Sequence, residues 1–452
     1  MLEAKYSRNN DDLTKKGVTL SNPEGELWPA PETQSPLDAT VVLPGSKSLM
    51  ARELVLAAMA NSPSLIQLPL VSRDSQLMIE ALEALGTRIE TAEDTLLVTP
   101  APELLGSTSI SCGLAGTVMR FIPALACLAL GPTVFDGDSY ARKRPMRGVI
   151  EALRDLGADI ADEGRGALPF TVHGNGSLKG GYVEIDSSES SQFVSALLLA
   201  GSQFEEGVHV KHIGESLPSI PHIEMTIECL RLRGVKVTKP AIGEWQVKPG
   251  AISGRNLVLE SDLSNAAPFL AAALVTGGKV TVPNWPNETT QVGDKLRDFL
   301  PKFGAEVTFS NGNLTVTSDG HISANDLHMS EAGELAPTMI GLAALADGPS
   351  TITGIGHIRH HETDRIAALA NECRKIGCEV EELDDGLRIV PPNKYVASDW
   401  NSYDDHRMAT TGALVGLRVP GTQIINIEST SKTMPRFTEM WNQMLGVQEN
   451  LP

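Results

Sequence analysis

The sequence predicts an α/β protein of two domains, in which the helices lie inside and the sheets outside. Three observations lead to this prediction: the sequence pattern repeats six times, one helix of each repeat is apolar on almost every side, and short strand-like runs separate the helices. A helix that is apolar all round is buried, so the sheets must surround it. Six repeats divide most simply into two domains of three, with the break near Glu260.

The first helix of each repeat is rich in alanine and leucine. The six helices read LVLAAMA at 54–60, FIPALACLAL at 121–130, FVSALLLAG at 193–201, FLAAALVTG at 269–277, IGLAALA at 340–346 and TTGALVGL at 410–417. The boundaries of the repeats vary by several residues. This irregularity argues against an open solenoid, whose stacked units keep a regular period.

The second helix of each repeat ends at a glycine. These residues are 69 to 77 positions apart: Gly86, Gly157, Gly234, Gly304, Gly377 and Gly446. Glycine is expected just past a helix C-terminus because it adopts the left-handed conformation without steric cost. The runs that follow five of them (TRIE, ADIA, VKVT, AEVT and CEVEE) alternate weakly, as half-buried strands do.

Composition narrows the class of protein. The chain has 452 residues and a formal net charge of −19, which disfavours binding to nucleic acid or to an anionic membrane surface. No apolar run reaches the length of a membrane span. Residues 1–24 are polar, without the apolar core of a signal peptide, and we expect a flexible extension there. Five cysteines without a CxxC motif suit a reduced cytoplasm, where we expect them to be core residues.

The stretch PGSKSLMAR, at 44–52, joins an apolar run to the first buried helix. Ser46 is placed to cap the helix, and Lys47 and Arg52 fall in its first turns. Cations are unfavourable at a helix N-terminus, which carries partial positive charge. An anion bound there would explain the two cations, the hydroxyls and the free backbone N–H groups. On this stretch alone, a solvated turn explains the residues equally well.

Other repeats begin with residues that suit the same chemistry. Their first helices open with CGLAGTVMR at 112–120, SSESSQF at 187–193, GELAP at 333–337 and YDDHRM at 403–408. The connectors add ARKRPM at 141–146, HIRHHETDR at 357–365 and SKTMPR at 431–436. We expect all of these segments to face one cleft between the two domains.

Taken in order, these motifs resemble those of the 5-enolpyruvylshikimate-3-phosphate synthase family over roughly residues 26–447. The resemblance implies a two-domain inverse α/β fold, an inside-out barrel with three βαβαββ units in each domain. It places the first domain at 45–260, the second at 25–44 plus 261–452, and the active site in the interdomain cleft. It also implies transfer of enolpyruvyl from phosphoenolpyruvate (PEP) to the 5-hydroxyl of shikimate 3-phosphate, with release of phosphate, by a cytoplasmic monomer without cofactor or metal.

The resemblance assigns roles to individual residues. Those matched to shikimate 3-phosphate are Lys47, Ser48, Arg52, Ser190, Ser191, Gln192, Ser219, Glu334 and His361. Those matched to PEP are Lys47, Gly116, Arg144, Gln192, Arg365, Arg407 and Lys432. Glu334 matches the base that takes the hydroxyl proton. Lys47, Glu362 and Lys432 remain alternatives for the acid that protonates C3 of PEP.

The chemistry of the substrates fits these residue types. PEP carries a carboxylate and a phosphate, and the planar arginine side chain binds both groups with paired hydrogen bonds. Some positions depart from the commonest family pattern, in a way that resembles the actinobacterial branch: Leu114, His222, Glu334, His357 and His361. Gly116 is kept, and glyphosate sensitivity is a hypothesis that follows from it.

Three alternatives stay open at this point. His357, His360, His361 and Glu362 resemble a metal site, but the HExxH pattern fails because Arg365 occupies its last position. A related UDP-N-acetylglucosamine enolpyruvyl transferase would need a reactive cysteine, and residues 131–148 contain none. A non-enzymatic anion-binding homologue would not need the whole cationic set. Arg120 is expected to form an internal salt bridge or to contact a ligand.

Overall fold

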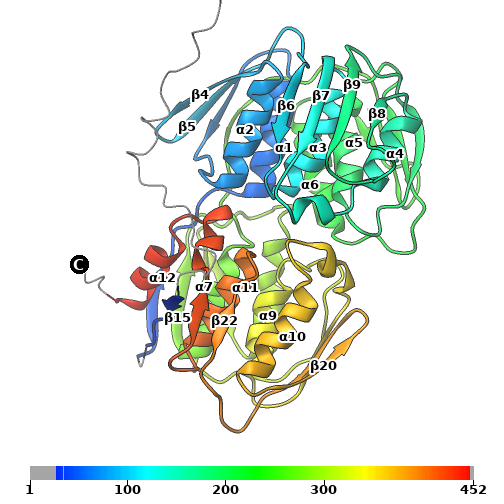
Figure 1. Cartoon of the computed structure of the whole chain (residues 1–452). Helices are drawn as coiled ribbons and strands as arrows, with labels where there is room; N and C mark the ends of the chain where they lie inside the picture. The colour runs from blue at the N-terminus through cyan, green and yellow to red at the C-terminus, as the bar shows by residue number, and fades with distance from the viewer. Residues whose placement is uncertain (1–26, 34, 448–452) are drawn as a thin grey trace, which may run out of the picture.

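The computed structural model describes residues 27–33 and 35–447. The predicted flexible extension at 1–24 lies outside the described residues. Two bodies are stacked in Figure 1, with α1 to α6 in the upper one and α7 to α12 in the lower one. None of the helices in the described part has the length and hydropathy that a bilayer span requires.

The first helix of each repeat lies inside its body, with most or all of its side chains buried. These helices are α1 (Lys47–Ala58), α3 (Gly116–Ala126), α5 (Gln192–Gly201), α7 (Ala266–Thr276), α9 (Ala336–Ala344) and α11 (His406–Gly416). Their apolar composition explains the burial, because no face of such a helix is suited to water.

The second helices are α2 (Arg73–Ala84), α4 (Arg147–Asp155), α6 (Ile220–Leu232), α8 (Leu296–Phe299), α10 (Arg365–Lys375) and α12 (Phe437–Leu445). The glycine after each of them has a positive φ, between 68° and 105°. This confirms the predicted left-handed caps. The fourth of these helices differs from the prediction, since α8 is one turn between the 3₁₀ helices Val292–Lys295 and Leu300–Phe303. Pro301 lacks the N–H that a continuous α-helix would need there.

In the described part of the chain, six sheets cover these helices, and five of them share one topology. In each of the five, a parallel pair of strands is extended by two antiparallel strands. The three sheets of the upper body are β14 (Asn256–Val258), β3 (Ser64–Gln67), β5 (Thr95–Thr99) and β4 (Arg88–Ala92); β6 (Thr108–Ser111), β7 (Leu130–Asp136), β9 (Phe170–Asn175) and β8 (Asp159–Ala161); and β10 (Gly181–Ile185), β11 (Val208–His212), β13 (Glu244–Val247) and β12 (Val237–Thr238).

The lower body has a similar pattern, and two of its sheets include a strand from the start of the chain. Its sheets are β2 (Leu37–Thr40), β15 (Gly278–Val282), β17 (Asn313–Ser318) and β16 (Glu306–Ser310); β18 (Leu327–His328), β19 (Ser350–Thr353), β21 (Gly386–Val390) and β20 (Glu379–Leu383); and β22 (Asp399–Asn401), β23 (Gln423–Ile425) and β1 (Leu27–Pro29). Strand β1 pairs antiparallel with β23, and β2 pairs parallel with β15. The N-terminal segment therefore completes two sheets of the lower body.

Two separate hydrophobic clusters form the interior. One extends from Met50 to Leu259, and the other joins Ala30, Leu37, Val41 and Leu43 to residues between 263 and 444. We propose that these clusters mark two domains, at 45–260 and at 25–44 plus 261–452. The separation of the clusters supports this division.

The chain passes between the two bodies twice, and the two crossing segments are hydrogen-bonded to each other. The Ser46 N–H donates to the Glu260 carbonyl at 2.8 Å, and the Asp262 N–H donates to the Pro44 carbonyl at 2.8 Å. A Cβ on Gly45 would lie 2.7 Å from both Leu259 Cδ2 and the Leu68 carbonyl oxygen. Only glycine fits this close approach, and the crossing leads directly into α1.

Candidate active site

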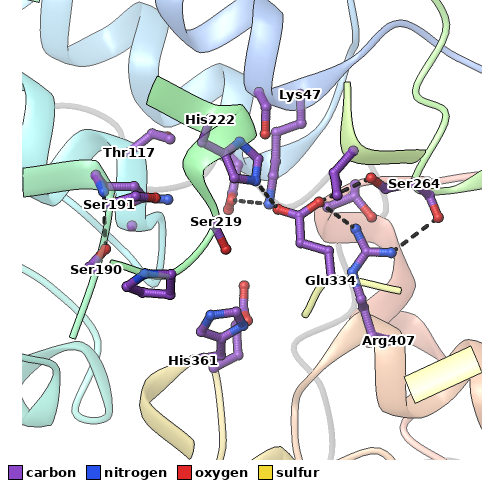
Figure 2. A pocket seen from close by; sticks show the side chains of 18 of the residues that line it. Lys47, Thr117, Ser190, Ser191, Ser219, His222, Ser264, Glu334, His361 and Arg407 are labelled. Carbon is purple, nitrogen blue, oxygen red and sulfur yellow. Dashed lines mark hydrogen bonds and ion pairs between the residues drawn. The ribbon is translucent and has the colours of Figure 1, made fainter. Parts of the chain in front are cut away.

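A cleft between the two bodies collects the starts of the buried helices (Figure 2). Most of the residues singled out in the sequence line it: Lys47, Ser48, Gly116, Arg144, Ser190, Ser191, Gln192, Ser219, Glu334, His361, Glu362, Arg365 and Arg407. They come from segments up to 360 positions apart in the chain. The expectation that these segments meet at one cleft is therefore met by the positions of their side chains.

Lys47 occupies the first turn of α1, as expected. Ser46 caps this helix by accepting a hydrogen bond from the Leu49 N–H, and the Lys47 N–H donates to Asp262 Oδ2 at 3.1 Å. The Lys47 Nζ lies 3.6 Å from Asp74 Oδ2, and its side chain is 22% exposed. This looser pairing leaves the ammonium group accessible from the cleft.

Hydroxyl and amide groups gather where α5 begins. Ser190 Oγ accepts a hydrogen bond from the Gln192 N–H at 3.3 Å. The Gln192 side-chain oxygen accepts one from Arg120 at 2.8 Å, and the Arg120 guanidinium lies over the Phe193 ring. Arg120 therefore holds Gln192 in place. The salt bridge considered for Arg120 is absent from the contacts of the described residues, and its Nε is buried without a hydrogen-bond partner.

Ser219 precedes α6 in a left-handed backbone conformation, with φ of 54°. Its N–H donates to the Ser330 carbonyl, which belongs to the opposite body, at 3.4 Å. A residue other than glycine in this region stores backbone strain. The contact places Ser219 at the line where the two bodies meet.

Glu334, at the start of α9, is contacted from both sides of the cleft (Figure 2). His222 Nε2 of α6 lies 2.9 Å from Glu334 Oε1, while Ser264 Oγ donates to Oε2 at 3.0 Å. An Arg407 nitrogen lies 3.5 Å from the same Oε2. Burial raises the pKa of the Glu334 carboxyl, but the neighbouring His222, Arg407 and Lys47 more than offset this, so the pKa lies well below its ordinary value. The group is a carboxylate at neutral pH.

An ion-pair network fills the second body's side of the cleft. Arg365 donates to both oxygens of Asp405, at 2.8 and 3.0 Å, and to Glu362 Oε2 at 2.8 Å. Lys432 Nζ lies 3.0 Å from Glu362 Oε1. Burial raises the pKa of Glu362, yet Lys432 and Arg365 bring it well below the ordinary value. Glu362 is therefore ionised, and its charge is balanced before any ligand arrives.

Gly116 is the first residue of α3 and lies against the guanidinium of Arg144. A Cβ at this position would lie 2.9 Å from one Arg144 nitrogen and 3.2 Å from the other, while the same guanidinium donates to the Leu114 carbonyl at 2.9 Å. The sequence suggested that glycine there leaves room for a ligand. The structure adds that glycine leaves room for the arginine.

Three histidines near the cleft are neutral. Burial, followed by the charge of Arg365, lowers the pKa of His361 well below its ordinary value and that of His357 to about 4. Burial also lowers the pKa of His406. His361 Nδ1 lies 2.9 Å from an Arg365 nitrogen, so it faces a cation. Over residues 27–33 and 35–447, no group of three histidine, cysteine or acidic side chains is arranged to hold a metal ion.

Two residues expected at the site do not line the cleft. The Arg52 guanidinium is buried between α1 and α6, where it donates to Thr226 Oγ1, to the Ser48 carbonyl and to the His222 carbonyl at 2.8 to 3.0 Å. Lys432 is turned towards Glu362 and is 8% exposed. Both residues contact cleft residues and lie one layer behind the surface.

The structure adds residues that sequence reasoning did not select. Those lining the cleft include Asp74, Thr117, Asp262, Ser264, Asn265 and Gln291. Ser264 and Asn265 lie at the start of α7, the first helix of the fourth repeat. Since the starts of the other five repeats carry site residues, the repeat itself was the signal that could have found them. No comparable pattern marks Asp74 or Gln291.

All five cysteines are buried and free, as expected. Cys112 precedes α3, and burial raises its pKa to about 12. Such a thiol is not a nucleophile at neutral pH. The cysteines therefore contribute packing to the two clusters.

Comparison with known proteins gives one answer. The sequence model of a family described as EPSP synthase (3-phosphoshikimate 1-carboxyvinyltransferase) matches residues 31–441. A 3-phosphoshikimate 1-carboxyvinyltransferase of Kocuria rhizophila is 49% identical over 445 residues, which are 96% of this chain and 99% of that protein. Two structures of EPSP synthase from Acinetobacter baumannii superpose with a TM-score of 0.74 at 24% identity, covering 92% of this chain and 97% or 98% of theirs. These structural matches confirm the predicted inside-out α/β fold.

Proposed function

The chain belongs to the EPSP synthase family, and on that premise we propose how its cleft residues divide the work of the reaction. The match to the family covers most of the chain and confirms the resemblance drawn from the motifs. The protein is a transferase that catalyses the enolpyruvyl transfer step of the shikimate pathway. The hydroxyl oxygen of shikimate 3-phosphate forms a bond to C2 of PEP, C3 gains a proton, and phosphate then leaves as C3 loses a proton.

Shikimate 3-phosphate occupies the half of the cleft that the first body supplies. Ser190, Ser191 and Ser219 hold its phosphate, and Ser48 and Gln192 contact the ring side. The support for this placement is that neutral donors gather at the starts of α1, α5 and α6. Hydroxyl and backbone N–H groups bind a phosphate well at helix N-termini. His361 closes the site from the other body, while Arg52 acts through the helices that it joins.

PEP occupies the half where Arg144, Arg365 and Arg407 converge. Their guanidinium groups pair with its carboxylate and phosphate, because the planar fork matches both anions. Lys47 stands between the two substrates, and Gly116 leaves the space that Arg144 needs. Lys432 contributes from behind by neutralising Glu362.

Glu334 is the general base, and Lys47 is the acid that protonates C3. The carboxylate form of Glu334 is the form that accepts a proton. Contacts from both bodies hold this carboxylate in the cleft, which supports its role as the base. Among the three alternatives for the acid, Glu362 is ionised and paired with two cations, and Lys432 lies behind Glu362, with which it is paired. Lys47 alone of the three combines a proton with an accessible position.

The protein acts as a cytoplasmic monomer in this proposal. Each chain supplies both halves of the cleft, so a second copy is not required to complete the site. The buried free cysteines support a reducing compartment.

The observation that carries the proposal is that the cationic and hydroxyl-bearing helix starts of both bodies line a single cleft. A phosphate-release assay tests it, with PEP as donor and either shikimate 3-phosphate or UDP-N-acetylglucosamine as acceptor. We expect release with shikimate 3-phosphate only. Release with the nucleotide sugar only would overturn the assignment, and release with neither acceptor would favour an anion-binding protein without activity.

A further inference from the structure

We propose that His222 is a positioning residue for Glu334: it reaches across the cleft and holds one oxygen of the carboxylate so that the remaining lone pairs face the substrate hydroxyl. This inference rests on the proposed role of Glu334 as the general base. Histidine and glutamate would then work as a pair, although they belong to different bodies and lie 112 positions apart in the sequence.

The contact between the two side chains is short and partly shielded from water. His222 Nε2 and Glu334 Oε1 are 2.9 Å apart, the side chains are 12% and 24% exposed, and the two point towards each other in Figure 2. The negative charge of a carboxylate strengthens a contact of this kind relative to one between neutral groups. Glu334 has three rotatable side-chain bonds, and Ser264 and Arg407 restrain only its other oxygen. His222 is therefore the contact that fixes the rotation of the carboxyl plane.

The backbone of His222 is itself held firmly. Its carbonyl accepts hydrogen bonds from Arg52 at 3.0 Å and from Thr226 Oγ1 at 2.9 Å, while its N–H donates to the Ser219 carbonyl at 3.0 Å. The N–H groups of Arg52 form hydrogen bonds within this part of the protein, and its guanidinium is buried. A cation that the sequence placed at the substrate thus acts through α6, and the first turn of that helix carries the ring.

Charged and titratable groups reach Glu334 from several elements besides α6. They are Lys47 of α1, Arg52 of α1, Asp262 of the crossing segment, His357 of the 3₁₀ helix Gly356–His360, Arg365 of α10 and Arg407 of α11. Of the groups that lower the pKa of Glu334 against the effect of burial, His222 contributes most. Its removal should therefore raise that pKa.

The first experiment compares His222→Phe and His222→Gln with wild type in the phosphate-release assay. We expect kcat to fall about 100-fold in the Phe variant and about 10-fold in the Gln variant, whose amide can still donate to the carboxylate. The KM for PEP should stay within about threefold. The acid limb of the kcat/KM profile should move to higher pH in both variants, a change that a purely structural role would not produce.

His209→Gln is the matched control. It removes a His–Glu contact of 3.1 Å between His209 and Glu244, which joins β11 to β13 away from the cleft. We expect wild-type kcat, KM and pH profile from this variant. Thermal melting of every variant identifies loss of folding. If the His222→Phe variant does not fold, the His222→Gln variant, which keeps a side chain of similar size, still tests the proposal.

A double-mutant cycle decides whether His222 acts through Glu334. In a Glu334→Ala background we expect His222→Gln to change kcat by less than about twofold, because the group it positions is absent. Independent, multiplicative losses would overturn the proposal. An unchanged kcat in the single variant would do so as well, as would a loss confined to the KM for shikimate 3-phosphate. If the wild-type protein itself releases no phosphate, the proposed function is refuted instead.

Discussion

The two halves of the cleft are built in opposite ways. In the half supplied by the first body, serine hydroxyls and an amide approach the cavity from helix starts; Ser190 Oγ accepts from the Gln192 N–H, and the Gln192 side chain accepts from Arg120. In the half supplied by the second body, Arg365 is tied to Asp405 and Glu362, and Lys432 to Glu362. The first half combines neutral donors with the cations Lys47, Arg120 and Arg144, whereas the second is a network of charges already paired.

This difference has a physical meaning for binding. Neutral donors exchange water for a phosphate at little cost, so the first half needs no rearrangement. Buried ion pairs contribute little net stability because desolvation opposes their attraction, but they fix geometry. The second half therefore holds its cations at set positions, where charge that develops in the reaction meets them without reorganisation. Substitutions in the two halves should have different consequences.

The largest effect is expected where the halves meet. Glu334→Ala should lower kcat by about 10³-fold, since general base catalysis contributes 10² to 10⁴, while the dissociation constants of both substrates change little. Steady-state kinetics and calorimetric titration measure the two quantities. Wild-type turnover would remove Glu334 from the role of base.

The next largest effect should be on folding and should distinguish the halves. Arg365→Met leaves Asp405 and Glu362 without their shared partner, and we expect a loss of about 3 to 5 kcal/mol in the free energy of unfolding. Ser190→Ala, in the other half, should change it by less than about 0.5 kcal/mol. Urea unfolding of both variants gives the comparison. Equal losses would mean that the ion-pair network is not what distinguishes the two halves.

A smaller effect is expected from the arginine that the first body sends to the PEP side. Arg144→Ala should raise the KM for PEP about 10- to 100-fold, because a charge-assisted pair contributes about 1.5 to 3 kcal/mol. The KM for shikimate 3-phosphate should stay near the wild-type value. An unchanged KM for PEP would refute the placement of Arg144.

The smallest effect concerns the pH dependence of folding in the second half. His357 has a pKa of about 4 in the folded protein, against 6.5 for a free histidine. Its contribution to stability is complete above pH 6.5 and is lost as the pH falls towards 4, because only the unfolded chain binds the proton there. His357→Asn should therefore reduce the loss of stability between pH 7 and pH 5 by about 2 kcal/mol. Urea unfolding at both pH values checks this, with the exposed His173→Asn as control. A loss of stability between pH 7 and pH 5 that equals the wild-type loss would contradict it.

Much of the fold is predictable because it depends on local patterns. The apolar first helices and the glycines that end the second helices carry their own signals, and all six of these glycines adopt the expected positive φ. The short α8 was also visible in principle, since Pro301 lies within the expected helix. The pairing of β1 with β23 was not visible, because strands that meet from opposite ends of the chain leave no local pattern.

The site was predictable as a set of residue types, but not in its contacts. The sequence pattern of a cation near a helix start is the same whether the side chain faces a ligand or a neighbouring helix. The direction of Arg52 depends on Thr226, which lies 174 positions away. The contact between His222 and Glu334 depends in the same way on how the two bodies approach each other. Such contacts come from tertiary packing, which a single sequence does not display.

The most direct test of this division is a crystal structure with shikimate 3-phosphate and PEP bound. We expect the 3-phosphate within hydrogen-bond distance of Ser190 and Ser191, the PEP anions on Arg144, Arg365 and Arg407, and a Glu334 oxygen beside the 5-hydroxyl. The phosphate of shikimate 3-phosphate bound to the ion-pair network, with PEP on the serines, would contradict this division.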